Sequence, residues 1–110
     1  MSKRNEKLLL KDILESIDKI FDYTNDMSKE EFLSDEKTKD AVVRNFEVIG
    51  EAASKLSEEL KAKHSDIDWK GVIGLRNVLI HDYFGVDYII VWTIKEKFLP
   101  ELKVKLKEIL

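Results

Sequence analysis

Apolar side chains recur every three or four residues along most of this chain, and this spacing is typical of amphipathic α-helices. A first stretch, residues 4–25, carries the pattern at Leu9, Ile13, Ile17, Ile20, Phe21 and Thr24. A second stretch begins after a cap at Ser34 or Asp35 and runs to about residue 61. It carries the pattern at Ala41, Val42, Phe46, Ile49, Ala53, Leu56 and Leu60. Four Gly and one Pro in 110 residues are too few for a turn-rich all-β fold. The sequence therefore predicts an all-α protein.

Capping residues divide the rest of the chain into helices. Ser28 with Glu31 forms a capping box that opens a short helix at 29–33. After a polar connection at 62–68, Asp68 can cap a third long helix at 69–84, which Gly85 would end. Asp87 can cap a fourth at 88–110, and Pro100 should kink or break it near Leu99. We expect one domain, residues 1–110, folded as an antiparallel bundle of four to five helices.

Small residues mark places where another part of the chain can come close. Gly50, Ala52 and Ala53 would let a second helix approach the second long helix. Gly71 and Gly74 weaken the start of the third helix slightly, or mark a close approach of a helix or ligand there.

Composition excludes several classes of protein. The chain has no Cys, so disulfides and thiolate metal sites are ruled out. No apolar run approaches the length of roughly 20 residues that spans a bilayer, and the charged N-terminal segment does not resemble a secretion signal, so we expect a cytoplasmic protein without a membrane partner. The net charge of −3 argues against a general nucleic-acid binder. No metal site or cofactor is predicted.

The run from Arg76 to Tyr83 is the chemically richest part of the chain. It places a guanidinium, an amide, an imidazole and a phenol within a few residues, at Arg76, Asn77, His81 and Tyr83. Arg can hold a phosphate bidentately, and His can transfer a proton near neutral pH. On an α-helix, Arg76 and Tyr83 would share one face, while Asn77 and His81 would be neighbours four residues apart. Because this polar sector is too wide for a tight pocket in one helix, two copies about a two-fold axis would be needed to form one groove.

Two interpretations of this run stay open at this point. In the first, Arg76 neutralises a scissile RNA phosphate, His81 acts as general acid or base, Asn77 orients His81, and Tyr83 contacts phosphate or a base. In the second, Arg76 pairs with Asp82 or another acid and His81 is a hydrogen-bonded core residue.

The run resembles the R-x4-H-x-Y signature of the HEPN-domain toxins, the HepT-like ribonucleases. The segment Ala41–Ala53, with its Ile-Gly-Glu-Ala core, is similar to the second helix of that family. Trp69 and the segments Val91–Ile94 and Leu99–Pro100 also look like the family, so the resemblance covers about residues 8–108.

The resemblance implies a HEPN-like helical bundle, a homodimer with a composite cleft, and a metal-independent endoribonuclease that acts as a toxin. It implies Arg76 and His81 as catalytic residues, with Asn77, Asp82 and Tyr83 in support. It also implies a cognate minimal nucleotidyltransferase antitoxin that transfers AMP to Tyr83. Two other functions remain in contention: a non-catalytic nucleotide- or RNA-binding regulatory module of a partner nucleotidyltransferase, and a scaffold dimer without nucleotide affinity.

Overall fold

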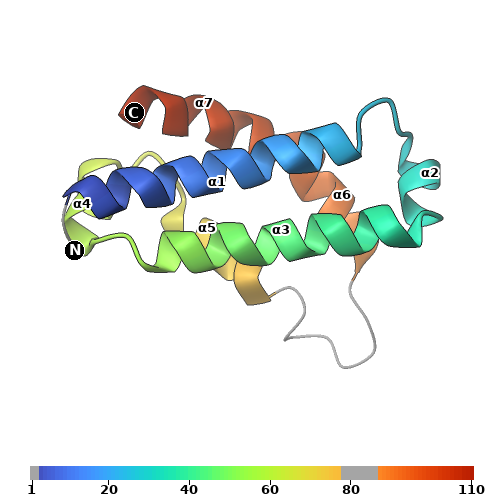
Figure 1. Cartoon of the computed structure of the whole chain (residues 1–110), viewed down its shortest axis with the longest axis horizontal. Coiled ribbons are helices and arrows are strands. Elements are labelled where there is room, and N and C mark those ends of the chain that lie inside the picture. The colour runs from blue at the N-terminus through green and yellow to red at the C-terminus, as the bar shows by residue number, and fades with distance from the viewer. Residues whose placement is uncertain (1–2, 78–86) are drawn as a thin grey trace.

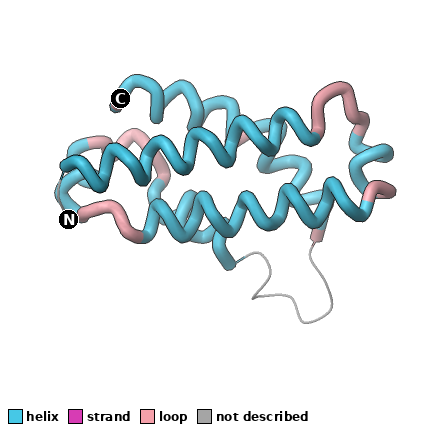
Figure 2. The backbone as a smooth tube through the Cα atoms, in the orientation of Figure 1, coloured by secondary structure: helices cyan, strands magenta, loops and turns pink. Residues whose placement is uncertain are grey.

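The computed structural model describes residues 3–77 and 87–110, and within these ranges it contains helices and no strand. The elements are α1 (Lys3–Tyr23), α2 (Lys29–Leu33), α3 (Glu36–Ser54), α4 (Glu58–Lys63), α5 (Trp69–Gly74), the 3-10 helix η1 (Leu75–Asn77), α6 (Tyr88–Lys97) and α7 (Leu99–Ile109). The predicted all-α bundle is therefore confirmed (Figures 1 and 2). None of the helices in the described ranges combines the length and apolar character needed to cross a bilayer.

The antiparallel pair of α1 and α3 forms the centre of the bundle (Figure 1). The apolar stripe of α1 meets that of α3, and the side chains along the contact are almost wholly buried: Ile13, Ile17, Ile20, Val42, Phe46 and Ile49. The spacing that predicted these two helices is thus the spacing that packs them together. α7 lies along α1 on the other side, and α5 with η1 packs against α3.

The short helix α2 anchors α6 at one end of the bundle. Ser28 forms the predicted capping box, since its hydroxyl accepts from the Glu31 amide while the Glu31 carboxylate accepts from the Ser28 amide. Phe32 is buried, and its ring lies 5.2 Å from that of Trp92 and 6.5 Å from that of Tyr88, measured between centroids. These ring contacts fix the beginning of α6, the first helix after the Arg76–Tyr83 run.

The second long helix ends earlier than its apolar pattern predicts. α3 stops at Ser54 rather than near residue 61, and α4 begins at Glu58. The hydroxyl of Ser57 accepts from the Leu60 amide, so Ser57 caps a new helix although Leu56 and Leu60 continue the earlier spacing. The predicted connection at 62–68 is correspondingly shorter, because α4 runs to Lys63.

The third predicted helix changes character partway. Asp68 caps it as expected, but the α-helix ends at Gly74 and Leu75–Asn77 form a 3-10 turn. The predicted continuation over residues 78–84 and the stop at Gly85 lie outside the described residues. The final helix is capped by Asp87 and is broken at Phe98, directly before Leu99 and Pro100, as predicted.

Candidate functional site

Arg76 and Asn77 are presented by a short helix that is firmly held at its start. The Asp68 carboxylate accepts from the Gly71 amide at 3.0 Å. The buried Trp69 ring donates from Nε1 to the carbonyl oxygen of His64 at 3.0 Å. Val72 and Leu75 face the core, so the tight turn that follows Gly74 leaves Arg76 and Asn77 half-buried beside α3.

A groove of about 680 Å³ opens at this turn, between α1, α3 and η1. Its lining residues are Leu9 and Asp12 of α1; Arg44, Glu47, Val48, Glu51 and Ala52 of α3; Lys55 at the end of α3; and Arg76 and Asn77. Three cations and three carboxylates line it, so the groove carries no net charge from the described side chains. Arg44 and Lys55 are exposed and stand on the same wall as Glu51.

Arg76 has an acidic partner in this groove. Its Nη1 lies 3.5 Å from Oε2 of Glu51, and the two side chains are 40% and 57% exposed. An ion pair this open is worth about 0–1 kcal/mol. Glu51 is thus an acidic partner of the kind that the second interpretation expects for Arg76. The pair is nevertheless weak enough for an incoming anion to displace it.

The backbone at Arg76 touches α3 at Gly50. A Cβ placed on Gly50 would overlap the backbone nitrogen of Arg76 and would lie 2.7 Å from both the Arg76 Cβ and the Ile73 carbonyl oxygen. The close approach expected at Gly50 is therefore real, although a 3-10 turn makes it rather than a long helix. Among the described residues, by contrast, nothing lies within 4 Å of a Cβ placed on Gly74, and the nearest atoms to a Cβ on Gly71 belong to the Asp68 carboxylate.

The other residues of the run, His81, Asp82 and Tyr83, lie outside the described residues. The prediction that Arg76 and Tyr83 share one face assumed that the whole run is α-helical. Leu75–Asn77 form a 3-10 helix, so the angular spacing of an α-helix does not apply at Arg76 and Asn77. Their predicted roles, and the predicted pairing of Asn77 with His81, stay predictions.

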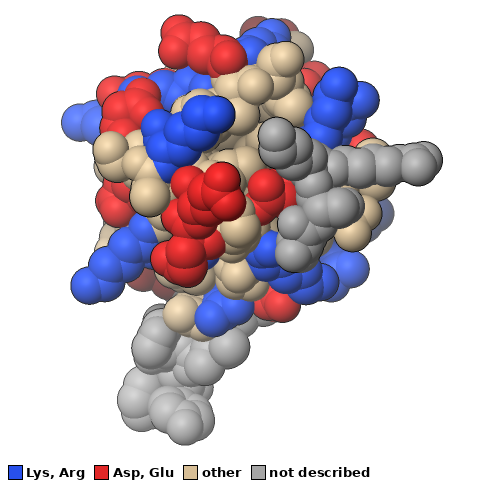
Figure 3. All heavy atoms as spheres, turned by 90° about the vertical axis from the view of Figure 1, so that its left-hand side faces the viewer, with Lys and Arg blue, Asp and Glu red and all other residues tan. Residues whose placement is uncertain are grey.

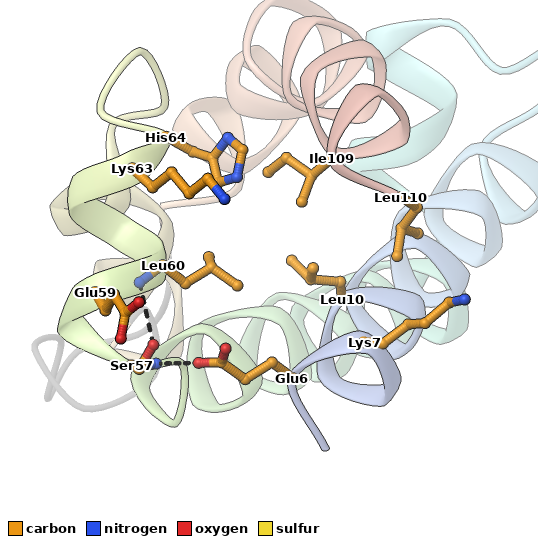
Figure 4. Close-up of a pocket in the computed structure, with 10 residues that line it drawn as sticks. All are labelled: Glu6, Lys7, Leu10, Ser57, Glu59, Leu60, Lys63, His64, Ile109 and Leu110. Carbon is orange, nitrogen blue, oxygen red and sulfur yellow. Dashed lines mark hydrogen bonds between the residues drawn. The ribbon is translucent and has the colours of Figure 1, made fainter. Parts of the chain in front are cut away.

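A second cavity, of about 580 Å³, lies at the end of the bundle where α1 begins and α7 ends. Figure 4 shows Lys63 and His64 at the end of α4 facing Leu10 and Ile109 across it. Figure 3 shows Lys and Arg side chains and Asp and Glu side chains interspersed among the other residues (tan) on this end of the molecule. His64, which falls within the predicted polar connection at 62–68, is half-exposed at the end of α4.

One carboxylate of this second cavity is engaged in holding the fold. Oε1 of Glu6 accepts from the Ser57 amide at 2.7 Å, which ties the start of α1 to the cap of α4. The hydrogen bonds from Ser57 lower the pKa of Glu6 below its ordinary value of 4.5.

Among residues 3–77 and 87–110, no group of three or more His, Asp or Glu side chains is arranged to hold a metal ion.

A family model described as "Ribonuclease HepT-like" matches residues 13–109 of this chain. The chain belongs to this HepT-like family. "Putative RNase MJ0127" of Methanocaldococcus jannaschii is 44% identical over 110 residues, which cover 100% of this chain and 91% of the relative. "Probable ribonuclease HepT" of Thermococcus cleftensis is 39% identical over 107 residues, 97% of each chain. No solved structure shows significant similarity to the chain.

Membership of the HepT-like family confirms the resemblance read from the motifs. Within this HepT-like fold, the structure brings two separated parts of the motif pattern together, since Gly50 and Glu51 of the Ile-Gly-Glu-Ala core contact Arg76. Sequence reasoning did not single out Arg44 and Lys55, which share the groove with Arg76. The available signal was their separation of eleven residues, about three helical turns, which places Lys55 at the end of α3 on the same side as Arg44.

Proposed function

We propose that this chain is a metal-independent endoribonuclease that uses Arg76 and His81. The observation that carries the proposal is the position of Arg76 in a HepT-like chain: its side chain is 40% exposed and borders an open groove. A guanidinium in this setting can bind a phosphate oxygen and offset the extra negative charge of a pentacoordinate transition state.

The chemistry follows from these two residues. The ribose 2′-oxygen attacks phosphorus, and the bond from phosphorus to the 5′-oxygen breaks. His81 takes the proton from the 2′-OH or supplies one to the leaving 5′-oxygen. The products are a 2′,3′-cyclic phosphate and a 5′-OH end, so no water enters this step. Two copies of the chain about a two-fold axis would supply two Arg76/His81 sets, one imidazole for each proton transfer.

The activity is tested by RNA cleavage in EDTA with wild type, Arg76→Ala and His81→Ala. We expect both variants to lose kcat by at least about 100-fold, the lower range for removing one electrostatic or acid–base group. Arg44→Ala is the matched control, because it removes the same charge from the same groove but lies outside the motif. It should raise KM and retain kcat. If Arg76→Ala and His81→Ala cut RNA like wild type, the assignment is wrong.

The same experiment separates this proposal from a non-catalytic RNA- or nucleotide-binding module. Binding that survives His81→Ala, with no turnover by wild type, would favour that module. A chain without measurable affinity for RNA or mononucleotides would instead be a scaffold.

We further propose that the chain is the toxin of a two-gene module and that a minimal nucleotidyltransferase neutralises it through Tyr83. Adenylylation would place bulk and negative charge within the motif that contains Arg76, which would obstruct an incoming phosphate. Expression of wild type should arrest growth, and co-expression with the nucleotidyltransferase should restore it. Intact mass should then rise by about 329 Da for each AMP, and Tyr83→Phe should abolish the addition. An unchanged mass with restored growth would refute control through Tyr83.

A further inference from the structure

We infer that Gly50 and Glu51, two consecutive residues of α3, are positioning residues that set the place of Arg76 in the groove. The inference rests on the proposed role of Arg76 as the phosphate ligand. Gly50 sets the position of the Arg76 backbone, and Glu51 sets the direction of its guanidinium.

Gly50 acts through direct contact with backbone. A Cβ at this position would meet the nitrogen and Cβ of Arg76 and the carbonyl oxygen of Ile73. None of these atoms is the end of a flexible side chain, so rotation about a side-chain bond cannot relieve the overlap. Restoring the two 2.7 Å contacts to an ordinary 3.4 Å would require the turn to move by at least about 0.7 Å, and the nearer backbone nitrogen of Arg76 would require more. The absence of a side chain at Gly50 therefore determines how close the 3-10 turn lies to α3.

Glu51 acts on the other end of the same residue. Oε2 of its carboxylate lies 3.5 Å from Nη1 of the Arg76 guanidinium. A guanidinium has five N–H donors, so a contact at Nη1 restrains its direction while other donors stay available for a phosphate. Because the pair is exposed and weak, it orients Arg76 without competing strongly against a phosphate.

The two contacts come from a rigid support. Gly50 is buried and Glu51 is exposed, as expected for consecutive positions at the edge of a helix face. The preceding residue, Ile49, is fully buried against the core. α3 is the central helix of the bundle, and its position is fixed by packing against α1. A displacement of Arg76 relative to α3 is therefore a displacement relative to the groove.

The expected effect on catalysis is large for Gly50 and smaller for Glu51. A misplacement of about 1 Å can cost about 100-fold in rate, so Gly50→Ala should lower kcat by roughly 10- to 100-fold. Glu51→Gln keeps the shape of the side chain and removes its charge, and it should lower kcat by about 3- to 10-fold through looser orientation. In both variants KM should change by less than about threefold, because a misplaced Arg76 can still attract a phosphate.

The chain supplies a matched control for each variant. Gly74→Ala adds the same methyl group two residues before Arg76, at a position where none of the described packing neighbours lies within 4 Å of the added carbon. Glu47→Gln removes the same charge from the same groove, one turn earlier on α3. The comparison is made between Gly50→Ala and Gly74→Ala, and between Glu51→Gln and Glu47→Gln, in kcat, KM and unfolding temperature.

A second measurement does not depend on nuclease activity. The chain contains three Arg residues, so the side-chain Nε–Hε signals in a 15N-labelled NMR spectrum are few, and Arg76→Ala identifies the one from Arg76. We expect this signal to shift in Gly50→Ala and Glu51→Gln and to stay in place in Gly74→Ala and Glu47→Gln.

The outcomes separate the inference from the proposed function. If the Arg76 signal stays in place in both test variants, or if each test variant cleaves RNA like its control, the positioning role is wrong. If wild type cleaves no RNA, the proposed function fails, and the NMR comparison still decides the positioning role. If Gly50→Ala does not fold, the Glu51 and Glu47 variants decide it.

Discussion

Replacing Phe32 with Ala should remove a large share of the stability of this protein. Phe32 is 1% exposed and is the buried residue of the five-residue helix α2. A helix of that length is not stable alone in water, so α2 depends on this burial and on its capping box. The Phe32 ring also contacts Trp92 and Tyr88 of α6.

The magnitude follows from burial. Truncating a fully buried Phe to Ala costs about 3–5 kcal/mol, which combines the lost transfer free energy with the cavity left behind. Domains of this size unfold with a free energy of about 5–15 kcal/mol, so the loss would be a third of the total or more in most of that range. At roughly 4 °C per kcal/mol, the melting temperature should fall by about 12–20 °C.

The assay is urea and thermal unfolding followed by circular dichroism. Phe21→Ala is the matched control, because Phe21 is half-buried and packs at the edge of the core. It should cost clearly less than Phe32→Ala. A loss of less than about 1 kcal/mol at Phe32, or a loss no greater than at Phe21, would show that α2 does not anchor α6 and would refute the reasoning.

Two further predictions concern the ends of short helices. The lowered pKa of Glu6 means that its hydrogen bond to Ser57 adds stability above pH 4.5, and that this stability is lost as pH falls through the lower folded-state pKa. The difference in unfolding free energy between wild type and Glu6→Gln should therefore shrink toward zero in acid, and a difference that is constant with pH would contradict this. Asp68→Ala should lower the free energy of unfolding, measured in urea, by about 1 kcal/mol, because the α5 cap is lost. Asp68→Asn keeps a side-chain oxygen that can accept from the Gly71 amide, so this variant should keep most of that stability. Equal losses in the two variants would show that the cap is not the cause.

Local signals in the sequence were sufficient for much of the fold. The apolar spacing identified α1, and the pair of Ser28 and Glu31 identified α2. Pro100 located the break between α6 and α7, because a proline disrupts the interior of a helix but is accepted in the first turn, where Pro100 stands in α7. The early end of α3 was missed, since Leu56 and Leu60 keep the helical spacing across a helix boundary. A second signal at the same place indicates the start of a new helix, namely Ser57 followed by Glu58 and Glu59.

The candidate site was only partly predictable, for a different reason. The motif supplied Arg76 and Asn77, but the helical spacing of the segment gave no sign of the 3-10 turn that carries them. The partnership of Arg76 with Glu51 joins residues 25 positions apart, which no local pattern encodes. Gly50 was recognised as a site of close approach, yet what approaches it became clear only in three dimensions.

The contact between Gly50 and the backbone of Arg76 also constrains how such a chain can evolve. Any side chain at position 50 forces the turn away from α3, so a lineage that still needs Arg76 in the groove cannot accept one. A lineage that has lost the need for Arg76 is released from that restriction. We therefore expect substitutions at positions 50 and 76 to occur together among homologous chains, which would make the pair a sequence-level marker of members that have abandoned this site.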